Sequence, residues 1–422
     1  MLGLSRRWIV VVVFAALLKI ALIPMTPLAQ WGDFWAWVNG AMIVSTNIQH
    51  GNIGIIASEG VYSGLMTFIA PFYWLWTILP VEHPPFYTML ASRDVFLGPP
   101  MSFLFALKLP IFLFDLLTGI LVAKLVQAQS SNAGAKGFLA WYLNPYNWVW
   151  LYWYSTYDII PTAIVTLAIL LAIKGRWLQC GLCLSFAGLL RLYPFLIFPF
   201  FLLYASRVSR RSILKFAAGF LAPVVSALLV MVVMIGSLNS LIMILLNTPL
   251  RQDWVLVFYG FPISNASISL TPFLLGVQLY LIMIWNRNGS SMTNVALVSI
   301  LLIFVGSYHH GYHFLWVSPF LSAYSDLDRK SMPLFVLTYF VAFFSPITYE
   351  GGVLPVFNSY YRDSLLALGE AITSGAFVAC KLAYVVLVNG KAISRKSFGS
   401  LPNVSHSTTK PVGPSLPKFH GA

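Results

Sequence analysis

The sequence predicts an all-α polytopic membrane protein, and three observations lead to this fold class. The chain of 422 residues is 59% hydrophobic and only 9% charged. Apolar runs of about 20 residues recur along nearly its whole length, and each is long enough to span a bilayer as a helix. The runs are continuous rather than alternating, which argues against a membrane β-barrel. Charge placement then gives about 12 transmembrane helices, with both termini on the cytoplasmic side.

The first outer loop is the longest connection that the sequence predicts. Two arginines near the N-terminus keep that end inside, and the apolar run 8–28 carries the chain outward. The next basic boundary, at 124–136, also belongs inside, so residues 29–100 are expected on the outer face. Within this loop, residues 61–80 are rich in aromatic side chains and are expected to form a helix at the membrane interface.

The next three expected spans carry charged residues inside or beside apolar runs. The span 101–126 contains Lys108 and Asp115, which are seven positions apart and therefore share one helix face. The spans 138–154 and 159–173 follow. Charges at membrane depth are costly and mark functional or packing sites.

A helical hairpin is expected at 177–206. Basic residues flank both ends of this run, so a single crossing would place one basic group outside. Pro194 disfavours a helix through the residues before it, so the break is expected at 191–194. The remaining expected spans are 212–235, 266–285, 293–306, 314–324, 332–348 and 365–388. Residues 1–397 then form one integral membrane domain, and 398–422, rich in Ser, Pro and Gly, form a disordered cytoplasmic tail.

The net charge of +13 does not indicate a nucleic-acid partner. Lysines and arginines fall mostly at the ends of apolar runs, where they set topology in a bilayer. The three cysteines, Cys180, Cys183 and Cys380, lie inside apolar runs and are expected to pack rather than to bind a metal. We therefore expect no nucleic acid, no metal and no other cofactor.

Ionisable residues gather on the expected outer side, which favours a site there. Asp33 stands in a tryptophan-rich stretch after the first span, Asp158 follows the third, and Arg191 lies at the hairpin break. The segment 308–313 contains His309, His310 and His313. In such an outer site a cation, Arg191 by preference, would bind a phosphate, and a carboxylate would act as a base on an incoming hydroxyl.

Each of these residues also has a structural interpretation. Asp115 is alternatively a packing residue paired with Lys108 or with a hydroxyl. Arg191 is alternatively a counter-ion to Asp158 or Asp115. The tryptophans and tyrosines near Asp33 are alternatively an aromatic belt at the interface.

Seven short motifs occur in a fixed order within residues 8–345. They are Gly32-Asp33-Phe34, Val61-Tyr62-Ser63-Gly64, the helix from Leu107 to Leu117, Leu143-Asn144-Pro145, Tyr157-Asp158, Leu190-Arg191-Leu192-Tyr193-Pro194 and Tyr312-His313-Phe314-Leu315-Trp316. In this order they resemble the GT-C glycosyltransferases, polytopic enzymes that use a polyprenyl-phosphate sugar as donor. The last motif is similar to one in the GPI mannosyltransferase I type.

The resemblance implies a GT-C-type bundle and a glycosyltransferase with an outer or lumenal active site. Such an enzyme would transfer a hexose, mannose by preference, from a polyprenyl- or dolichyl-phosphate sugar to a glycan or lipid acceptor with inversion. Asp33 would be the catalytic base. The donor phosphate would be bound by Arg191, Tyr193 and His313. The supporting polar or sugar-binding residues would be Asp158, Asp115, Lys108, His309 and His310.

One departure from the family pattern concerns metal binding. A paired acidic motif is frequent in the first loop of the mannosyltransferase members, whereas Asp33 stands alone here with Trp35 two positions on. This departure supports the prediction of no metal. The membrane would be the cell membrane of a prokaryote or the endoplasmic reticulum of a eukaryote.

Two other functions remain open from the sequence. A transporter or lipid flippase would use Lys108, Asp115, Asp158 and Arg191 as a pathway through the membrane. A subunit of a multi-protein membrane complex would also explain the helices.

Overall fold

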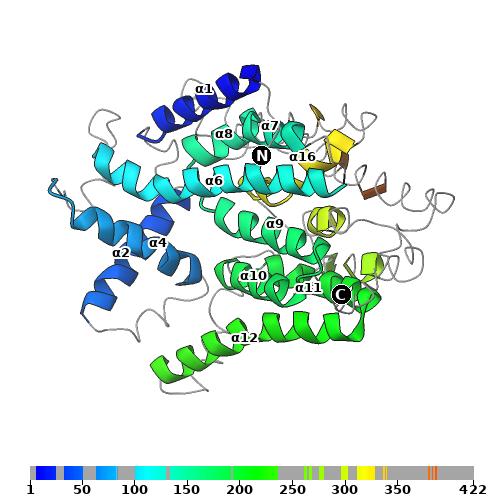
Figure 1. Cartoon of the computed structure of the whole chain (residues 1–422). Helices are drawn as coiled ribbons and strands as arrows, with labels where there is room; N and C mark the ends of the chain where they lie inside the picture. Colours follow the sequence, from blue (N-terminus) through cyan, green and yellow to red (C-terminus); the bar gives the residue numbers. More distant parts are fainter. Residues whose placement is uncertain are drawn as a thin grey trace, which may run out of the picture.

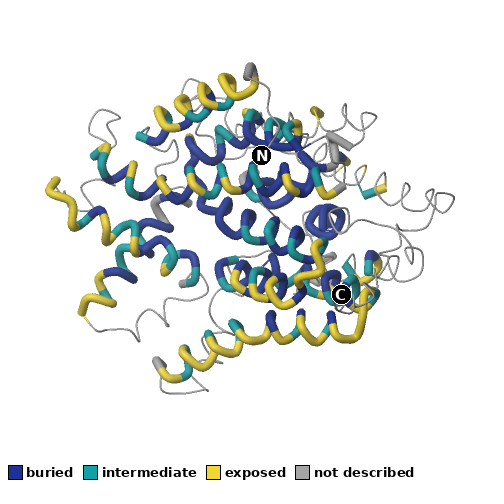
Figure 2. The backbone as a smooth tube through the Cα atoms, viewed as in Figure 1, coloured by how far each residue is buried: buried dark blue, intermediate teal, exposed yellow. Residues whose placement is uncertain are grey.

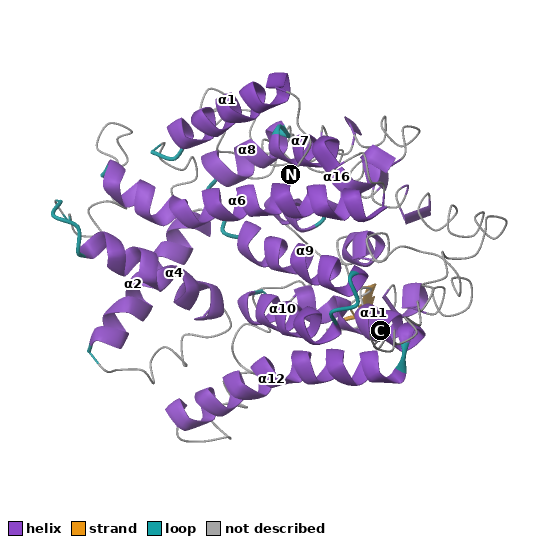
Figure 3. Cartoon of the chain, viewed as in Figure 1, coloured by secondary structure: helices purple, strands orange, loops and turns teal. Residues whose placement is uncertain are grey.

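The computed structural model describes mainly the first 235 residues. The described residues are 6–24, 33–50, 63–81, 83, 100–129, 134–191, 193–235, 261–263, 266–268, 275–279, 296–302, 311–327, 336–337, 339, 379–380, 383 and 385–386. These residues are almost all helical, with one short pair of strands (Figure 3).

A long helix organises the N-terminal part of the chain. The helices here are α1 (Arg6–Leu22), α2 (Asp33–Gln49), α4 (Ser63–Thr77) and α6 (Met101–Gln129). α6 runs across the middle of the molecule, with α1 above it and the α2–α4 pair to one side in the view of Figure 1. α2 packs on α4, and α4 packs on α6.

Short helical pieces follow α6 and lead into a buried helix. They are α7 (Gly134–Tyr142), α8 (Pro145–Trp148) and the wide π-helical turn η2 (Val149–Trp153), after which comes α9 (Ile159–Ile173). Asn144 stops α7 and starts α8, because its side chain accepts a bond from the Tyr146 amide and Pro145 takes the first helical position. α7 and α9 both pack on α6.

Three consecutive helices form the next layer. They are α10 (Trp177–Leu190), α11 (Tyr193–Val208) and α12 (Arg210–Ile235), and α10 packs between α9 and α12. Two glycines let α10 and α12 approach closely. A Cβ on Gly181 would meet the Phe216 carbonyl oxygen, and a Cβ on Gly219 would meet the Leu178 carbonyl oxygen.

The described C-terminal pieces add a hairpin and a helix. The strands β1 (Phe261–Ile263) and β2 (Ala266–Ile268) pair antiparallel. The 3₁₀ helix η4 (Gly311–Trp316) leads into α16 (Ser318–Leu327), which packs on α6 and α7.

Burial separates inner helices from outer ones. α9 is buried along almost its whole length, whereas α1 and α12 expose apolar side chains at opposite edges (Figure 2). Within the described residues, Met101–Ala128 and Arg210–Val233 are long and apolar enough to cross a bilayer. These exposed apolar faces agree with the predicted helical membrane protein, while the predicted number of crossings stays a prediction.

Several predicted helices are confirmed. The expected span 159–173 coincides with α9, and 101–126 coincides with α6 to within a few residues. The hairpin 177–206 is present as α10 and α11, broken at Arg191. The aromatic segment 61–80 contains α4, although nothing here tests its position at an interface.

Other predicted elements are wrong. The span 138–154 is not one helix, because Asn144 and Pro145 divide it into α7, α8 and η2. A helix does not begin at 266, since residues 266–268 pair with β1 as a strand. The loop 29–100, expected to contain interfacial helices of which only 61–80 was given bounds, contains a second helix, α2. The first helix ends at Leu22, before Pro24. The tail 398–422 lies outside the described residues.

Candidate functional site

Three charged or ionisable side chains from distant parts of the chain meet beside α9. The Nε of Arg191 donates to Oδ1 of Asp158 at 2.7 Å, and Nε2 of His313 lies 3.8 Å from Oδ2. The Asp158 side chain is fully buried, whereas the side chains of Arg191 and His313 are 11% and 12% exposed. We call this group the Arg191 cluster.

Helix ends position the Arg191–Asp158 pair. Arg191 has an extended backbone (φ −150°, ψ 140°) in the break between α10 and α11, where Pro194 in the first turn of α11 prevents a continuous helix. Asp158 precedes α9, and its carbonyl oxygen accepts from the hydroxyl and amide of Thr162 at 2.7 and 3.2 Å. Both side chains thus project from fixed helix ends.

A tight turn brings Asp158 back toward the cluster after η2. Ser155 in this turn has φ 63°, a left-handed conformation that is uncommon for a residue with a side chain. Its hydroxyl donates to the Tyr152 carbonyl oxygen at 3.3 Å, which supports the turn. Strained backbone of this kind persists only where the surrounding structure holds it.

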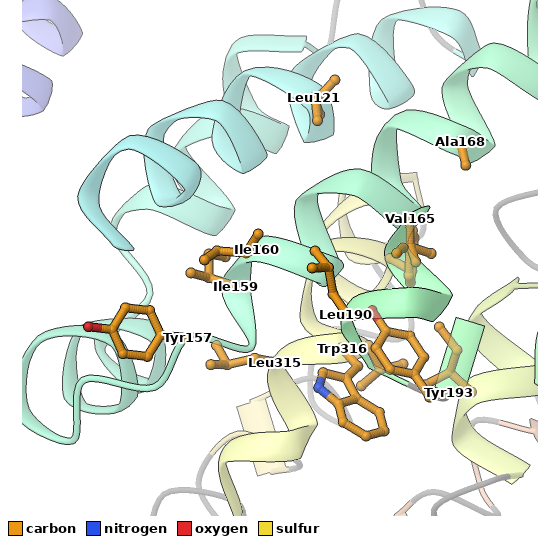
Figure 4. Close-up of a cluster of buried hydrophobic side chains, with 14 of the residues drawn as sticks. Leu121, Tyr157, Ile159, Ile160, Val165, Ala168, Leu190, Tyr193, Leu315 and Trp316 are labelled. Carbon is orange, nitrogen blue, oxygen red and sulfur yellow. The ribbon is translucent and has the colours of Figure 1, made fainter. Parts of the chain in front are cut away.

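Aromatic rings lie beside the Arg191 cluster. The guanidinium carbon of Arg191 lies 4.5 Å from the ring centroid of Trp37, a cation–π arrangement. The Trp316 ring stacks on Tyr193, with centroids 4.0 Å apart and planes at 12°, and it also contacts His313 at 4.6 Å. Figure 4 shows Tyr193 and Trp316 side by side, close to Leu190.

The geometry suits recognition better than proton abstraction. Asp158 is buried and already bonded to a guanidinium, so its lone pair is not presented to an incoming hydroxyl. The Arg191 guanidinium and the charged His313 imidazolium are hydrogen-bond donors, and both side chains are partly exposed. They form an exposed cationic edge beside the rings of Trp37 and Trp316. Such an edge can bind an anionic or hydroxyl-rich group.

A second buried ion pair lies in the N-terminal part. Nζ of Lys19 lies 2.6 Å from Oδ2 of Asp115, and both side chains are fully buried. Asp115 also accepts from the Tyr152 hydroxyl at 2.8 Å and from Trp141 Nε1 at 2.9 Å. The Tyr142 ring centroid lies 3.5 Å from Lys19 Nζ.

Lys108 does not pair with Asp115 as one interpretation expected. Its Nζ donates to the Tyr152 carbonyl oxygen at 3.1 Å and lies 5.9 Å from the Phe34 ring centroid. The hydroxyl partner expected for Asp115 is confirmed, since Tyr152 provides it. Lys19 takes the charged role, because its Nζ contacts Oδ2 of Asp115, the oxygen that also accepts from the Tyr152 hydroxyl.

The structure brings together part of the predicted site. Arg191, Asp158 and His313 form the Arg191 cluster, and Tyr193 is connected to it through the Trp316 ring. The counter-ion interpretation of Arg191 is confirmed, with Asp158 as its partner. Asp115 belongs to the other buried pair, and Lys108 lies close to it through its bond to Tyr152. Asp33 is the first residue of α2, but its side chain lies outside the described part, as do His309 and His310.

Contributing residues that were not predicted as site residues include Lys19, Trp37, Tyr152 and Trp316. A lone lysine within an apolar run is a recognisable signal, because charge at membrane depth needs a partner. The three aromatic residues give no such signal in a chain with this many rings. Among the described residues, no group of three His, Cys, Asp or Glu side chains is arranged to hold a metal ion. The absence of a metal stays a prediction.

Comparison with known proteins gives one family. A model of the family described as "GPI transamidase subunit PIG-U" matches residues 80–274, less than half of the chain. The matched part includes Lys108, Asp115, Asp158 and Arg191, and it excludes Lys19 and His313. No curated protein sequence matches the chain.

The match supports similarity to a membrane protein of the GPI pathway and corrects the predicted activity. The family description names a subunit of a transamidase, so the prediction of a glycosyltransferase is wrong. The motif order that suggested a sugar transferase describes membrane helices and their breaks, and such a framework does not determine the reaction.

Proposed function

We propose that this chain is a membrane subunit of a GPI transamidase complex that contributes binding rather than catalysis. The observation that carries the proposal is the family match over residues 80–274. Its partners would then be the other protein subunits of the complex and a GPI glycolipid, in place of a sugar donor. The membrane would be that of the endoplasmic reticulum.

The Arg191 cluster supports a binding role within that complex. A GPI carries phosphate and sugar hydroxyl groups at a membrane surface, and both are acceptors that guanidinium and imidazolium groups recognise. Arg191 is held by Asp158 and by the Trp37 ring, so its orientation is fixed before any ligand arrives. A group held in advance loses less conformational entropy on binding.

The test uses cells that lack their own subunit of this family and express the tagged full-length chain. The surface level of a GPI-anchored reporter protein is measured by flow cytometry, and the proteins that co-purify with the tag are identified by mass spectrometry. The wild-type chain is expected to restore the reporter and to co-purify transamidase subunits.

Two arginine variants separate assembly from binding. Arg191→Ala is expected to co-purify the same subunits but to restore less reporter. Arg176→Ala, on the same hairpin but exposed and outside the cluster, is expected to behave as wild type. A well-expressed wild-type chain that neither co-purifies a transamidase subunit nor restores the reporter would overturn the proposal.

A further inference from the structure

The surroundings of Lys19 have the composition of an ammonium-binding site. We call them the Lys19 cage, formed by Asp115, Trp141, Tyr142, Trp148 and Tyr152. Nζ of Lys19 lies 2.6 Å from the carboxylate of Asp115. It also lies 3.5, 5.6 and 5.6 Å from the ring centroids of Tyr142, Trp148 and Tyr152.

This combination recognises a particular kind of group. Aromatic faces attract a cation through their quadrupole, and a carboxylate supplies the opposing charge and a hydrogen-bond acceptor. The carboxylate is itself fixed from two sides, by the Tyr152 hydroxyl and by Trp141 Nε1. The cage is therefore built on α6, α7 and the residues after α7, without any contribution from α1 other than its occupant.

The occupant is carried by a helix with little other attachment. Among the described side chains of α1 and its last turn, Ala15, Lys19 and Ile23 are buried at intervals of four residues. Val12, Ala16 and Leu22 are partly buried beside them. The outward side exposes a series of large apolar side chains: Trp8, Ile9, Val10, Val11, Val13, Phe14, Leu17, Leu18 and Ile20. α1 lies at the edge of the molecule in Figure 1 and is mostly exposed in Figure 2.

We propose that the Lys19 cage is a binding site for a primary ammonium group, and that Lys19 is its exchangeable internal occupant. Displacement of α1 would open the cage to an ammonium supplied by a free amine or by a lipid head group. The proposal rests on the cage and on α1, and it does not depend on the proposed function.

The first experiment vacates the cage in the full-length protein. Lys19→Ala is purified in detergent, and its thermal unfolding is followed by tryptophan fluorescence during titration with ethylammonium. The melting temperature is expected to rise by roughly 2–4 °C in Lys19→Ala and to stay constant in wild type. The matched controls are 1-propanol, which has a similar size but no charge, and Lys19→Ala/Asp115→Asn, which lacks the carboxylate. Neither control is expected to respond, and an equal response of all samples would overturn the proposal.

The second experiment tests exchange in the wild-type protein and needs no variant. The chain is reconstituted in bilayer discs, and acetylation of Lys19 is measured by mass spectrometry relative to Lys215, an exposed lysine on α12. This ratio corrects for reagent that the lipid or the amine consumes. It is expected to rise severalfold when ethanolamine-headgroup lipid replaces choline-headgroup lipid.

Soluble ethylammonium in choline-lipid discs distinguishes the two sources. A rise with both additions identifies any primary ammonium as ligand, whereas a rise with the lipid alone identifies a lipid head group. An unchanged ratio in both cases shows that Lys19 is a permanent structural partner of Asp115, and the proposal is then wrong.

Discussion

The two buried ion pairs of this protein use the same chemistry in different surroundings. In the Lys19–Asp115 pair both side chains are fully buried, and the carboxylate also accepts hydrogen bonds from the aromatic residues Trp141 and Tyr152. In the Arg191–Asp158 pair the acid is fully buried, but the base is 11% exposed and a histidine stands nearby. The Lys19–Asp115 pair is therefore closed to solvent, whereas the guanidinium of the Arg191–Asp158 pair is partly accessible.

This difference in exposure assigns the two pairs different roles, structural stabilisation for the first and ligand binding for the second. A sealed pair contributes to structure through the cost of leaving either charge alone in a medium of low dielectric. A pair with an exposed edge loses less when one partner is removed, because water can solvate the other, but it keeps donors available for a ligand. The four predictions below test this comparison, from the largest expected effect to the smallest.

Asp115→Ala is expected to have the largest effect. It leaves Lys19 charged, buried and unpaired, which costs about 3–5 kcal/mol of unfolding free energy. The measurement is denaturant-induced unfolding of the purified protein in detergent. A loss of unfolding free energy below about 1 kcal/mol would show that the Lys19 ammonium reaches the membrane surface in the variant, as long cationic side chains do. The pair would then not be closed to solvent.

Asp158→Ala is expected to cost less stability and more function. Arg191 loses a charged hydrogen bond of about 1.5–3 kcal/mol, but its exposed edge keeps part of its hydration. Unfolding is measured as for Asp115→Ala, together with reporter restoration in cells. If Asp158→Ala is as destabilising as Asp115→Ala and the reporter is fully restored, the two pairs do not differ in role.

Trp37→Leu removes the ring beside the guanidinium while it keeps an apolar side chain. The cation–π contact contributes about 0.5–2 kcal/mol, so we expect a loss of that size and a partial loss of reporter restoration. Trp8→Leu is the matched control, because Trp8 is 45% exposed on α1. Equal effects of the two substitutions would mean that Trp37 acts only through its hydrophobic surface.

The triple variant Lys19→Met/Asp115→Leu/Tyr152→Phe is expected to have the smallest effect. Removing both charges together with the hydroxyl leaves no unpaired group, and replacing a buried ion pair by apolar side chains of similar volume is often neutral for stability. Trp141 keeps an acceptor, because its Nε1 also lies 3.2 Å from the backbone oxygen of residue 115. A large loss in the triple variant would show that the pair itself, and not the avoidance of a lone charge, holds α1 in place.

Local patterns in the sequence account for much of the fold. The bounds of α9 follow from a continuous apolar run between polar ends, and the break at Arg191 follows from Pro194. Both signals act within a few residues, so neither needs knowledge of the tertiary structure. α2 was missed because its residues mix polar and apolar types without a long apolar run, and packing on α4 stabilises it.

The partners of the charged residues were harder to predict. Helix spacing suggested Lys108 for Asp115, since the two share a face of α6, but the charged partner comes from a helix 96 positions earlier in the chain. Only the packing of α1 against α7 and η2 decides this choice. For Arg191 the sequence left two counter-ions open, Asp158 and Asp115, and the structure selects Asp158.

The distance along the chain between Lys19 and Asp115 has a consequence for how the protein is made. Translation at about 5–20 residues per second leaves roughly 5–20 seconds between the synthesis of the lysine and that of its partner, which stands 96 positions later. During that interval α1 must enter or wait beside the bilayer with an uncompensated charge. α10, α11 and α12, whose contacts with one another are local in sequence, meet no such delay. Biogenesis of this protein therefore depends on keeping α1 within reach until α6 has been delivered to the membrane.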